Sequence, residues 1–296
     1  MFITTLLLFA LANETRYAKP TMLIEPADLV KVVADGKAII LDVRPRKEYE
    51  AGHVPGARWV DVEVWSKAVN AGEGGEKWTH RVGALGIDGS IPVVVVDGAR
   101  PLAAARVWWI LRHWGLEDVR LLNGGWKGWR EKGGPEVTEV PVVVPTRPKL
   151  KKVPERLATR EQVSGVVKMI RAQTRVVGTT PGWVLIDTRS KEEHCGEKKT
   201  AKRNGAIPEA RHLEWSDTID PITGRFKTAP ELEMLMANAG FSARNPAVTY
   251  CQSGGRAAVM AFVMELMSGQ PAMNYYRSWA EWGNDPDTPV VTPKKK

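Results

Sequence analysis

Residues 38–44 read Ala38-Ile39-Ile40-Leu41-Asp42-Val43-Arg44, and residues 183–189 read Trp183-Val184-Leu185-Ile186-Asp187-Thr188-Arg189. Each stretch is a short apolar run that ends on an aspartate, with an arginine two positions later. Such runs predict strands that are buried on both faces, as in a parallel sheet. Because the run occurs twice, we expect a duplicated unit.

The duplication continues downstream of both strands. Gly52-His53-Val54-Pro55-Gly56-Ala57-Arg58 corresponds to Gly205-Ala206-Ile207-Pro208-Glu209-Ala210-Arg211, and Pro92-Val93-Val94-Val95-Val96-Asp97 corresponds to Pro246-Ala247-Val248-Thr249-Tyr250-Cys251. The spacing between the copies is 145 residues at Asp42 and 154 residues at Asp97, which predicts an insertion in the second copy, within residues 195–204. A repeat of this length indicates two similar domains and not a solenoid of short units.

Apolar runs alternate with helical patterns in both halves. We expect strands at residues 39–43, 93–96, 119–122, 185–187 and 248–250, and helices at residues 103–114 and 256–267, which end before Gly115 and Gly269. This alternation predicts an α/β fold in which each domain is an open, mainly parallel sheet flanked by helices, with sites at the carboxyl ends of the strands. We place the domains at residues 22–134 and 155–290. The proline-rich linker between them, residues 135–154, cannot be helical throughout.

The composition of the 296-residue chain is that of an ordinary globular protein, with 43% hydrophobic and 26% charged residues, and each half is long enough to bury a core. Its two cysteines, Cys195 and Cys251, are too few for a disulfide framework or a four-ligand zinc site. We therefore expect no metal and no cofactor. The net charge of +8 lies partly in residues 149–152 and 294–296, which is typical of a solvated linker and tail and not of nucleic-acid binding.

The first twelve residues are apolar except for Thr4 and Thr5, and Ala10-Leu11-Ala12 has the small-x-small form of a signal-peptidase site. The segment is too short to span a bilayer, and no other stretch is long enough. We expect export to the periplasm or the exterior. The alternative is a cytoplasmic protein with a wrongly assigned start, since no basic residue precedes Arg16.

Cys251 opens the run Cys251-Gln252-Ser253-Gly254-Gly255-Arg256 between a predicted strand and a predicted helix. The two glycines allow backbone N–H groups to turn inward, and the helix adds the positive end of its dipole. These features and the Arg256 guanidinium favour thiolate over thiol, so we predict that Cys251 is a nucleophile. The alternative is a buried structural cysteine.

Cys195 lacks such surroundings, because its neighbours are His194, Gly196 and Glu197 in what we expect to be a polar loop. On an extended segment the adjacent His194 would point away from it. We expect no role for Cys195 in chemistry.

Together these motifs resemble the tandem-domain rhodaneses, the thiosulfate and 3-mercaptopyruvate sulfurtransferases, from about Met22 to Thr288. The resemblance rests on Gly52-His53-Val54-Pro55-Gly56-Ala57, Val94-Val95-Val96-Asp97-Gly98, Arg106-Val107-Trp108-Trp109, Leu122-Asn123-Gly124-Gly125-Trp126 and Tyr250-Cys251-Gln252-Ser253-Gly254-Gly255-Arg256. In that family the second domain is catalytic and the first is a copy without the cysteine. Asp97 stands at the corresponding position here.

The resemblance implies that Cys251 takes the outer sulfur of thiosulfate as a persulfide, releases sulfite, and passes the sulfur to cyanide, a thiol or a thioredoxin-like protein. It implies a substrate cradle made of Gln252, Ser253, Gly254, Gly255 and Arg256, with the guanidinium on the anionic end of the donor. Asp187 and Arg189 would support the loop, as a structural ion pair more than as chemical groups. We expect a small anionic sulfur donor and a monomeric protein that binds no nucleic acid.

Several departures from the family pattern leave alternatives open. The loop cation is Arg256, later in the loop than in familiar two-domain members, so 3-mercaptopyruvate remains an alternative donor. Glu193 stands where animal members place a substrate-binding arginine. A phosphatase or arsenate reductase is disfavoured, because Cys-x5-Arg needs one residue more than separates Cys251 from Arg256. A further alternative is a sulfur-relay or binding module with a protein acceptor.

Overall fold

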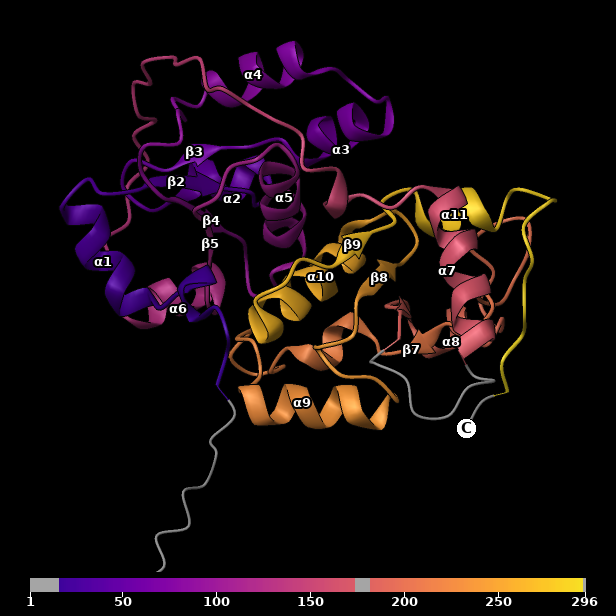
Figure 1. Cartoon of the computed structure of the whole chain (residues 1–296). Helices are drawn as coiled ribbons and strands as arrows, with labels where there is room; N and C mark the ends of the chain where they lie inside the picture. The colour runs from indigo at the N-terminus through magenta and orange to yellow at the C-terminus, as the bar shows by residue number, and fades with distance from the viewer. Residues whose placement is uncertain (1–15, 174–181, 295–296) are drawn as a thin grey trace, which may run out of the picture.

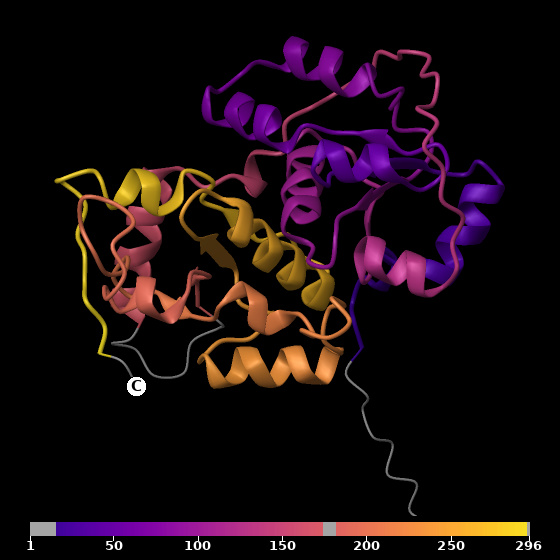
Figure 2. The same ribbon diagram turned by 180° about the vertical axis from the view of Figure 1, so that it is seen from behind.

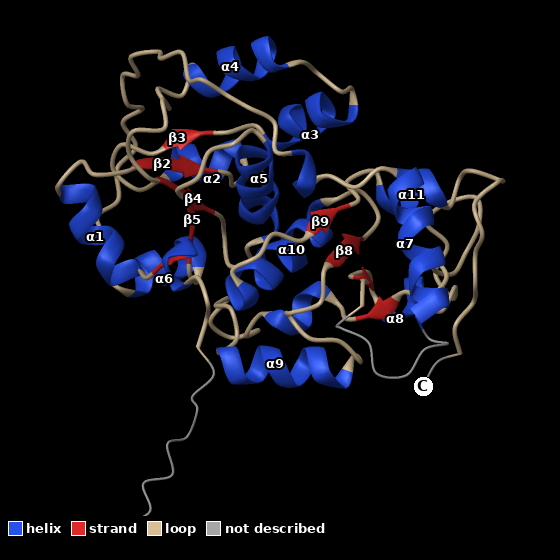
Figure 3. Cartoon of the chain, in the orientation of Figure 1, coloured by secondary structure: helices blue, strands red, loops and turns tan. Residues whose placement is uncertain are grey.

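The computed structural model describes residues 16–173 and 182–294, which form two α/β domains lying side by side (Figure 1). The first sheet has the strand order β1-β5-β4-β2-β3 and the second the order β7-β6-β8-β9. Every strand pair is parallel, and helices lie on both faces of the sheets (Figure 3). The expected fold class is therefore confirmed. The predicted export segment lies outside the described residues.

The first domain alternates strands and helices from its start. Its elements are η1 (Pro20–Met22), β1 (Leu23–Ile24), α1 (Pro26–Ala34), β2 (Ile39–Asp42), α2 (Arg46–Ala51), β3 (Arg58–Trp59), α3 (Val62–Asn70), α4 (Gly75–Gly83), β4 (Val93–Val96), α5 (Leu102–His113), β5 (Val119–Leu122) and α6 (Gly125–Glu131).

The second domain repeats the central part of this order. Its elements are η2 (Pro154–Arg156), α7 (Arg160–Gln173), β6 (Val184–Asp187), α8 (Lys191–His194), β7 (Arg211–His212), η3 (Trp215–Thr218), α9 (Ala229–Asn238), β8 (Ala247–Tyr250), α10 (Gly255–Ser268), β9 (Met273–Asn274) and α11 (Ser278–Trp282). Where the first sheet has β1 at its edge, the second has a single parallel bridge between Leu157 and Asn274.

Side chains of the central strands alternate between two cores. In β2, Ile39 and Leu41 face a core that continues into the second domain, whereas Ile40 faces an outer core closed by α1 and α6. In β6, Ile186 faces the shared core and Leu185 faces an outer core with α7 and α11. Burial on both faces explains why these strands read as continuous apolar runs.

The shared core is built by α5 and α10, which pack against each other at the domain boundary (Figure 2). Trp108 of α5 meets Phe262 of α10 edge to face at 4.9 Å between ring centroids. Trp109 stacks on Tyr276 at 5.0 Å. Neither tryptophan is exposed to solvent, so each domain completes the core of the other.

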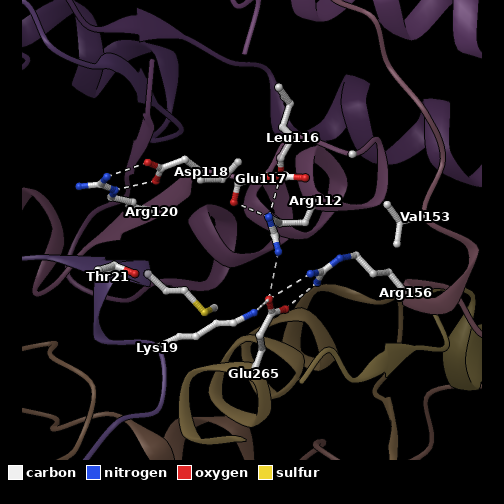
Figure 4. A pocket seen from close by; sticks show the side chains of 13 residues that line it. Lys19, Thr21, Arg112, Leu116, Glu117, Asp118, Arg120, Val153, Arg156 and Glu265 are labelled. Carbon is white, nitrogen blue, oxygen red and sulfur yellow. Dashed lines mark hydrogen bonds and ion pairs between the residues drawn. The ribbon is translucent and has the colours of Figure 1, made fainter. Parts of the chain in front are cut away.

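A buried ion cluster adds to this boundary beside a cavity of about 700 Å³ (Figure 4). The carboxylate of Glu265, on α10, is 1% exposed and accepts bonds from Arg156 at 2.7 Å, Arg112 at 3.1 Å and Lys19 at 3.2 Å. Burial opposes ionisation of Glu265, but the hydrogen bonds and charge of Arg156, with the other cations, hold its pKa below the usual range. The cluster ties α10 to Lys19 and α5 of the first domain and to η2.

The linker, residues 135–154, runs along the first domain without regular structure apart from a bridge at Val137 and the start of η2 at Pro154. Its backbone is held at intervals, for example where the Thr146 N–H donates to the Gly83 carbonyl. The helices of the described chain are all too short, or too polar, to cross a membrane.

Candidate active site

Cys251 directly follows β8, at the carboxyl edge of the second sheet. Its side chain is 1% exposed, and the chain turns from it through Gln252 and Ser253 into α10. Gly254 makes this turn with φ of 81°, and a Cβ there would lie 2.7 Å from both the ring and the carbonyl oxygen of Tyr276. Glycine is therefore required on both conformational and steric grounds.

The backbone carbonyls of residues 251–254 all accept hydrogen bonds. The carbonyl of Cys251 accepts from the Trp279 N–H, and that of Gln252 accepts from the Ala280 N–H. Arg106 donates to the Ser253 carbonyl at 3.0 Å, and Asn274 donates to the Gly254 carbonyl at 3.0 Å.

The loop amides are left unused. Within the described chain, the backbone N–H groups of residues 252–256 donate no hydrogen bond to the protein. They lie at the N-terminus of the 14-residue helix α10, where the helix dipole is positive. An anion formed on Cys251 would meet free donors and a favourable potential.

Arg256 lies on the first turn of α10, and its guanidinium is already paired. It donates to both oxygens of Glu193, at 2.6 and 2.9 Å. Burial lowers the pKa of Arg256, but the bonds to Glu193 outweigh this, and Cys251 also contributes to raising it. The same contact, against the effect of burial, holds the pKa of Glu193 below its usual range. A donor anion would have to share Arg256 with this carboxylate.

Gln252 and Ser253 point in different directions. The Gln252 side chain donates to the Thr200 carbonyl at 2.9 Å, which fixes it against the inserted segment, while its Oε1 is buried without a partner. Ser253 is exposed at the surface of the loop. Gln252 therefore holds the loop against residue Thr200, whereas the Ser253 side chain faces solvent.

Asp187 and Arg189 form a fully buried ion pair behind the loop, with Nη2 to Oδ2 at 2.6 Å. The Tyr250 hydroxyl and the His194 ring also bond to the Asp187 carboxylate, at 2.7 and 2.9 Å. Burial opposes the charge on Asp187, but Arg189 and His194 outweigh it and keep its pKa well below the usual range.

The first domain contains the same ion pair. Arg44 bonds to Asp42 at 2.6 Å and to the Gly52 carbonyl at 2.7 Å, as Arg189 bonds to Asp187 and to the Gly205 carbonyl at 2.8 Å. Since the pair also occurs beside Asp97, where there is no cysteine, it serves the scaffold of both domains.

Two expectations about the segment after Ser190 are wrong: that it is extended at His194, and that Cys195 lies in a polar loop. His194 and Cys195 do not lie on an extended polar loop: α8 covers Lys191–His194, Cys195 caps it, and both side chains are buried. The cause is a capping box, in which Ser190 and Glu193 satisfy each other's backbone N–H groups. Ser-x-x-Glu is the sequence signal that could have identified this helix.

Ser278 is a site residue that the sequence reasoning missed. Its hydroxyl accepts from the Cys251 N–H at 3.0 Å, donates to the Tyr275 carbonyl at 2.6 Å, and lies 3.9 Å from Sγ. Its φ is 52°, a left-handed conformation unusual for serine. The corresponding residue of the first domain is Gly125, with φ of 56°, so comparing the repeats at this position would have singled out Ser278.

Asp97 occupies the place of Cys251 in the first domain. The Trp126 N–H donates to its carbonyl as that of Trp279 donates to Cys251, so the backbone frame is shared. Its carboxylate, however, accepts from the N–H groups of Gly98, Ala103 and Ala104, at 2.8, 2.7 and 3.0 Å. The Asp97 side chain thus occupies three backbone N–H groups of its own loop and of the start of α5. Across residues 16–173 and 182–294, no cluster of three or more potential metal ligands occurs.

Comparison with known proteins supports a single family for both halves. The model of the rhodanese-like domain matches residues 25–132 and 173–285. The chain is 31% identical to the sulfur carrier protein TtuD of Thermus thermophilus and 31% identical to a thiosulfate sulfurtransferase of Azotobacter vinelandii, in each case over 93% of this chain and 98% of the relative. Among solved structures it is similar to the anaerobic ergothioneine biosynthesis enzyme of Chlorobium limicola, with a TM-score of 0.77 at 23% identity, over 95% of this chain and 72% of that one.

Proposed function

Because this chain belongs to the rhodanese family, with two rhodanese-like domains in tandem, we propose that it transfers sulfur from thiosulfate to a thiophilic acceptor through a persulfide on Cys251. The observation that carries the proposal is the Cys251 loop, whose carbonyls are anchored while its amides are free. Relatives named thiosulfate sulfurtransferase support the choice of donor.

In the first half-reaction the Cys251 thiolate attacks the outer sulfur of thiosulfate. A bond forms between the two sulfurs, the sulfur–sulfur bond of the donor breaks, and sulfite leaves with its electron pair. The terminal sulfur of the persulfide now carries the negative charge. It receives hydrogen bonds from the amides of residues 252–256, at the positive end of α10.

In the second half-reaction the acceptor attacks the terminal sulfur. Cyanide leaves as thiocyanate, or a thiolate leaves as its persulfide, and the Cys251 thiolate is restored with the electron pair of the broken bond. Ser278 holds the Cys251 backbone N–H throughout and stands 3.9 Å from Sγ. Because Cys251 is 1% exposed, the loop admits a slim donor end-on and disfavours bulky ones.

A persulfide assay tests the proposal. After incubation with thiosulfate and removal of excess donor, mass spectrometry should find one added sulfur atom on the peptide containing Cys251. Cys251→Ser should lose this adduct, and the matched control Cys195→Ser, which changes the other buried cysteine, should keep it. An adduct that persists in Cys251→Ser, or no adduct on the native chain, would overturn the proposal.

A second candidate is sulfur delivery to a protein thiol, favoured by the relative named as a sulfur carrier, 98% of which is covered. The two functions share the first half-reaction and differ in the acceptor. Turnover with cyanide, with a small dithiol and with a reduced thioredoxin-like protein distinguishes them. A preference of kcat/KM for 3-mercaptopyruvate over thiosulfate would instead indicate the other donor.

A further inference from the structure

Arg106 lies on α5 of the first domain and reaches across the boundary to the Cys251 loop. Its Nη1 donates to the Ser253 carbonyl and to the Tyr276 hydroxyl, each at 3.0 Å, and to the Ser66 hydroxyl at 3.2 Å. The guanidinium also lies over the Tyr276 ring, with Cζ 5.5 Å from its centroid. These contacts fix the side chain in one place.

The rest of the guanidinium lies against the start of α10. A Cβ built on Gly255 would be 2.2 Å from Nη2 and 2.9 Å from Nε of Arg106, so these two nitrogens rest on the bare backbone of the first helical residue. They have no acceptor among the residues that the structure describes. They therefore offer unused donors next to the unused amides of the loop.

Charge distinguishes Arg106 from the other arginines around the site. Arg256 is paired with Glu193, Arg189 with Asp187, and Arg277 with Glu281. Arg106 contacts only neutral oxygens, and no carboxylate pairs with it in the described chain. Of these four arginines, it is therefore the one whose charge is not balanced by a neighbouring acid among the described residues.

We propose that Arg106, supplied by the domain that lacks the cysteine, binds the anionic group of the sulfur donor beside the Cys251 loop. This inference rests on the proposed function, since it assigns the donor-binding group of that site. It changes the role expected of Arg256, whose guanidinium holds Glu193. A planar guanidinium with two free nitrogens fits a sulfonate-like or carboxylate end by paired hydrogen bonds.

Steady-state kinetics with thiosulfate and cyanide provide the first test. Arg106→Met keeps much of the side-chain volume and removes the charge, and we expect it to raise KM for thiosulfate about ten- to hundredfold, as expected for a lost charge-assisted bond, with a smaller change in kcat. Arg106→Lys keeps the charge but loses the planar pair of nitrogens, and its KM should lie between the values for the native chain and Arg106→Met. An unchanged KM in both variants would overturn the proposal.

Arg277→Met is the matched control for a purely structural role. Arg277 also crosses the domain boundary, donating to the Asn70 carbonyl at 3.2 Å, but its charge is paired with Glu281. We expect its KM to stay within about twofold of the native value, since an exposed pair contributes little. An equal rise in KM in Arg277→Met would show that Arg106 acts only as a clamp between the domains.

Sulfite binding separates this inference from the proposed function, because it needs no turnover. Calorimetric titration of sulfite into Cys251→Ser should show binding that weakens about tenfold or more when Arg106→Met is added, and less when Arg106→Lys is added. Equal affinity with and without Arg106 would contradict the inference even if thiosulfate is the donor. If the native chain forms no persulfide but sulfite binding still depends on Arg106, the proposed function fails and the anion site stands.

Discussion

The Cys251 loop and the Asp97 loop share a backbone arrangement, but they differ in whether their backbone N–H groups are already hydrogen-bonded. Both follow the central strand of a parallel sheet, precede the helix at the domain boundary, and accept a bond from a tryptophan N–H at their first carbonyl. In the first domain the Asp97 carboxylate takes three backbone donors for itself. In the second domain those donors are left free. Reactivity in this fold therefore depends on which side chain stands at the strand end and what it leaves unbonded.

The largest expected effect comes from changing the residue that differs between the two loops, Cys251 in one and Asp97 in the other. Cys251→Ala should lower sulfur transfer by about a thousandfold or more, as expected for loss of a nucleophile. Asp97→Asn should leave the rate within about twofold, because the first loop offers no nucleophile and its Asp97 side chain already occupies three backbone N–H groups. Thiocyanate formation from thiosulfate and cyanide measures both, and comparable losses in the two variants would show that the first loop takes part in the chemistry.

The next effect concerns the left-handed position that Gly125 and Ser278 share. A Cβ on Gly125 would lie 2.0 Å from the Gly98 carbonyl oxygen, so Gly125→Ser should destabilise the protein by about 2–4 kcal/mol through strain and backbone displacement. Ser278→Gly relieves strain while losing two hydrogen bonds, and its free energy of unfolding should stay within about 1 kcal/mol of the native value.

The same pair also separates stability from activity. Because Ser278 contacts the Cys251 N–H and Sγ, Ser278→Gly should lower kcat about tenfold despite its near-native stability. Chemical denaturation and steady-state rates on one preparation measure both quantities. Native activity in Ser278→Gly would show that the Ser278 hydroxyl only supports the backbone and does not contribute to the rate.

A third effect uses pH. Burial raises the pKa of Asp97 to about 6, against its three amide bonds, so the folded protein holds this proton over a range in which the unfolded chain has lost it. Protonated Asp97 therefore adds to the free energy of unfolding below pH about 4, and this contribution is lost as the pH rises through about 6. The free energy of unfolding of the native chain relative to Asp97→Asn should fall by about 3 kcal/mol from pH 3 to pH 8. A constant difference would contradict this environment for Asp97.

The smallest effect concerns the turn that leads into β3 and into β7. Gly56 makes this turn with φ of 74°, and Glu209 makes it in the second domain with φ of 65°. Glu209→Gly should stabilise the protein by about 0.5–1 kcal/mol, since relief of strain exceeds the entropy that glycine adds to the unfolded chain. Thermal unfolding measures the gain, and a loss of stability would mean that the Glu209–Arg171 ion pair, at 3.0 Å, outweighs the strain.

Most of the fold could be predicted because local sequence patterns indicate its strands and helices, and these patterns occur twice. The central strands β2, β4, β6 and β8 and the helices α5 and α10 lie within a residue or two of the expected ranges, since each is an uninterrupted apolar run or a helical pattern closed by glycine. The short helix α8 was missed because its four residues are too few to show a helical period, and its capping box carries the signal instead.

The candidate site was predictable only in part. The position of Cys251 after a strand and before Gly254 was visible in the chain order. The pairing of Arg256 with Glu193, the hydroxyl of Ser278 beside Sγ and the reach of Arg106 from the other domain depend on tertiary contacts between segments up to about 150 residues apart. Such contacts leave no local pattern.

The shared core has a consequence for synthesis on the ribosome. Trp108 and Trp109 of α5 pack against Phe262 and Tyr276, which emerge about 150 residues later. At roughly 5–20 residues per second, the nascent first domain presents an apolar helix face for about 10–30 s before its cover exists. We therefore expect this half of the chain to need protection from aggregation during translation, and a first domain produced by cutting the gene at the linker to aggregate.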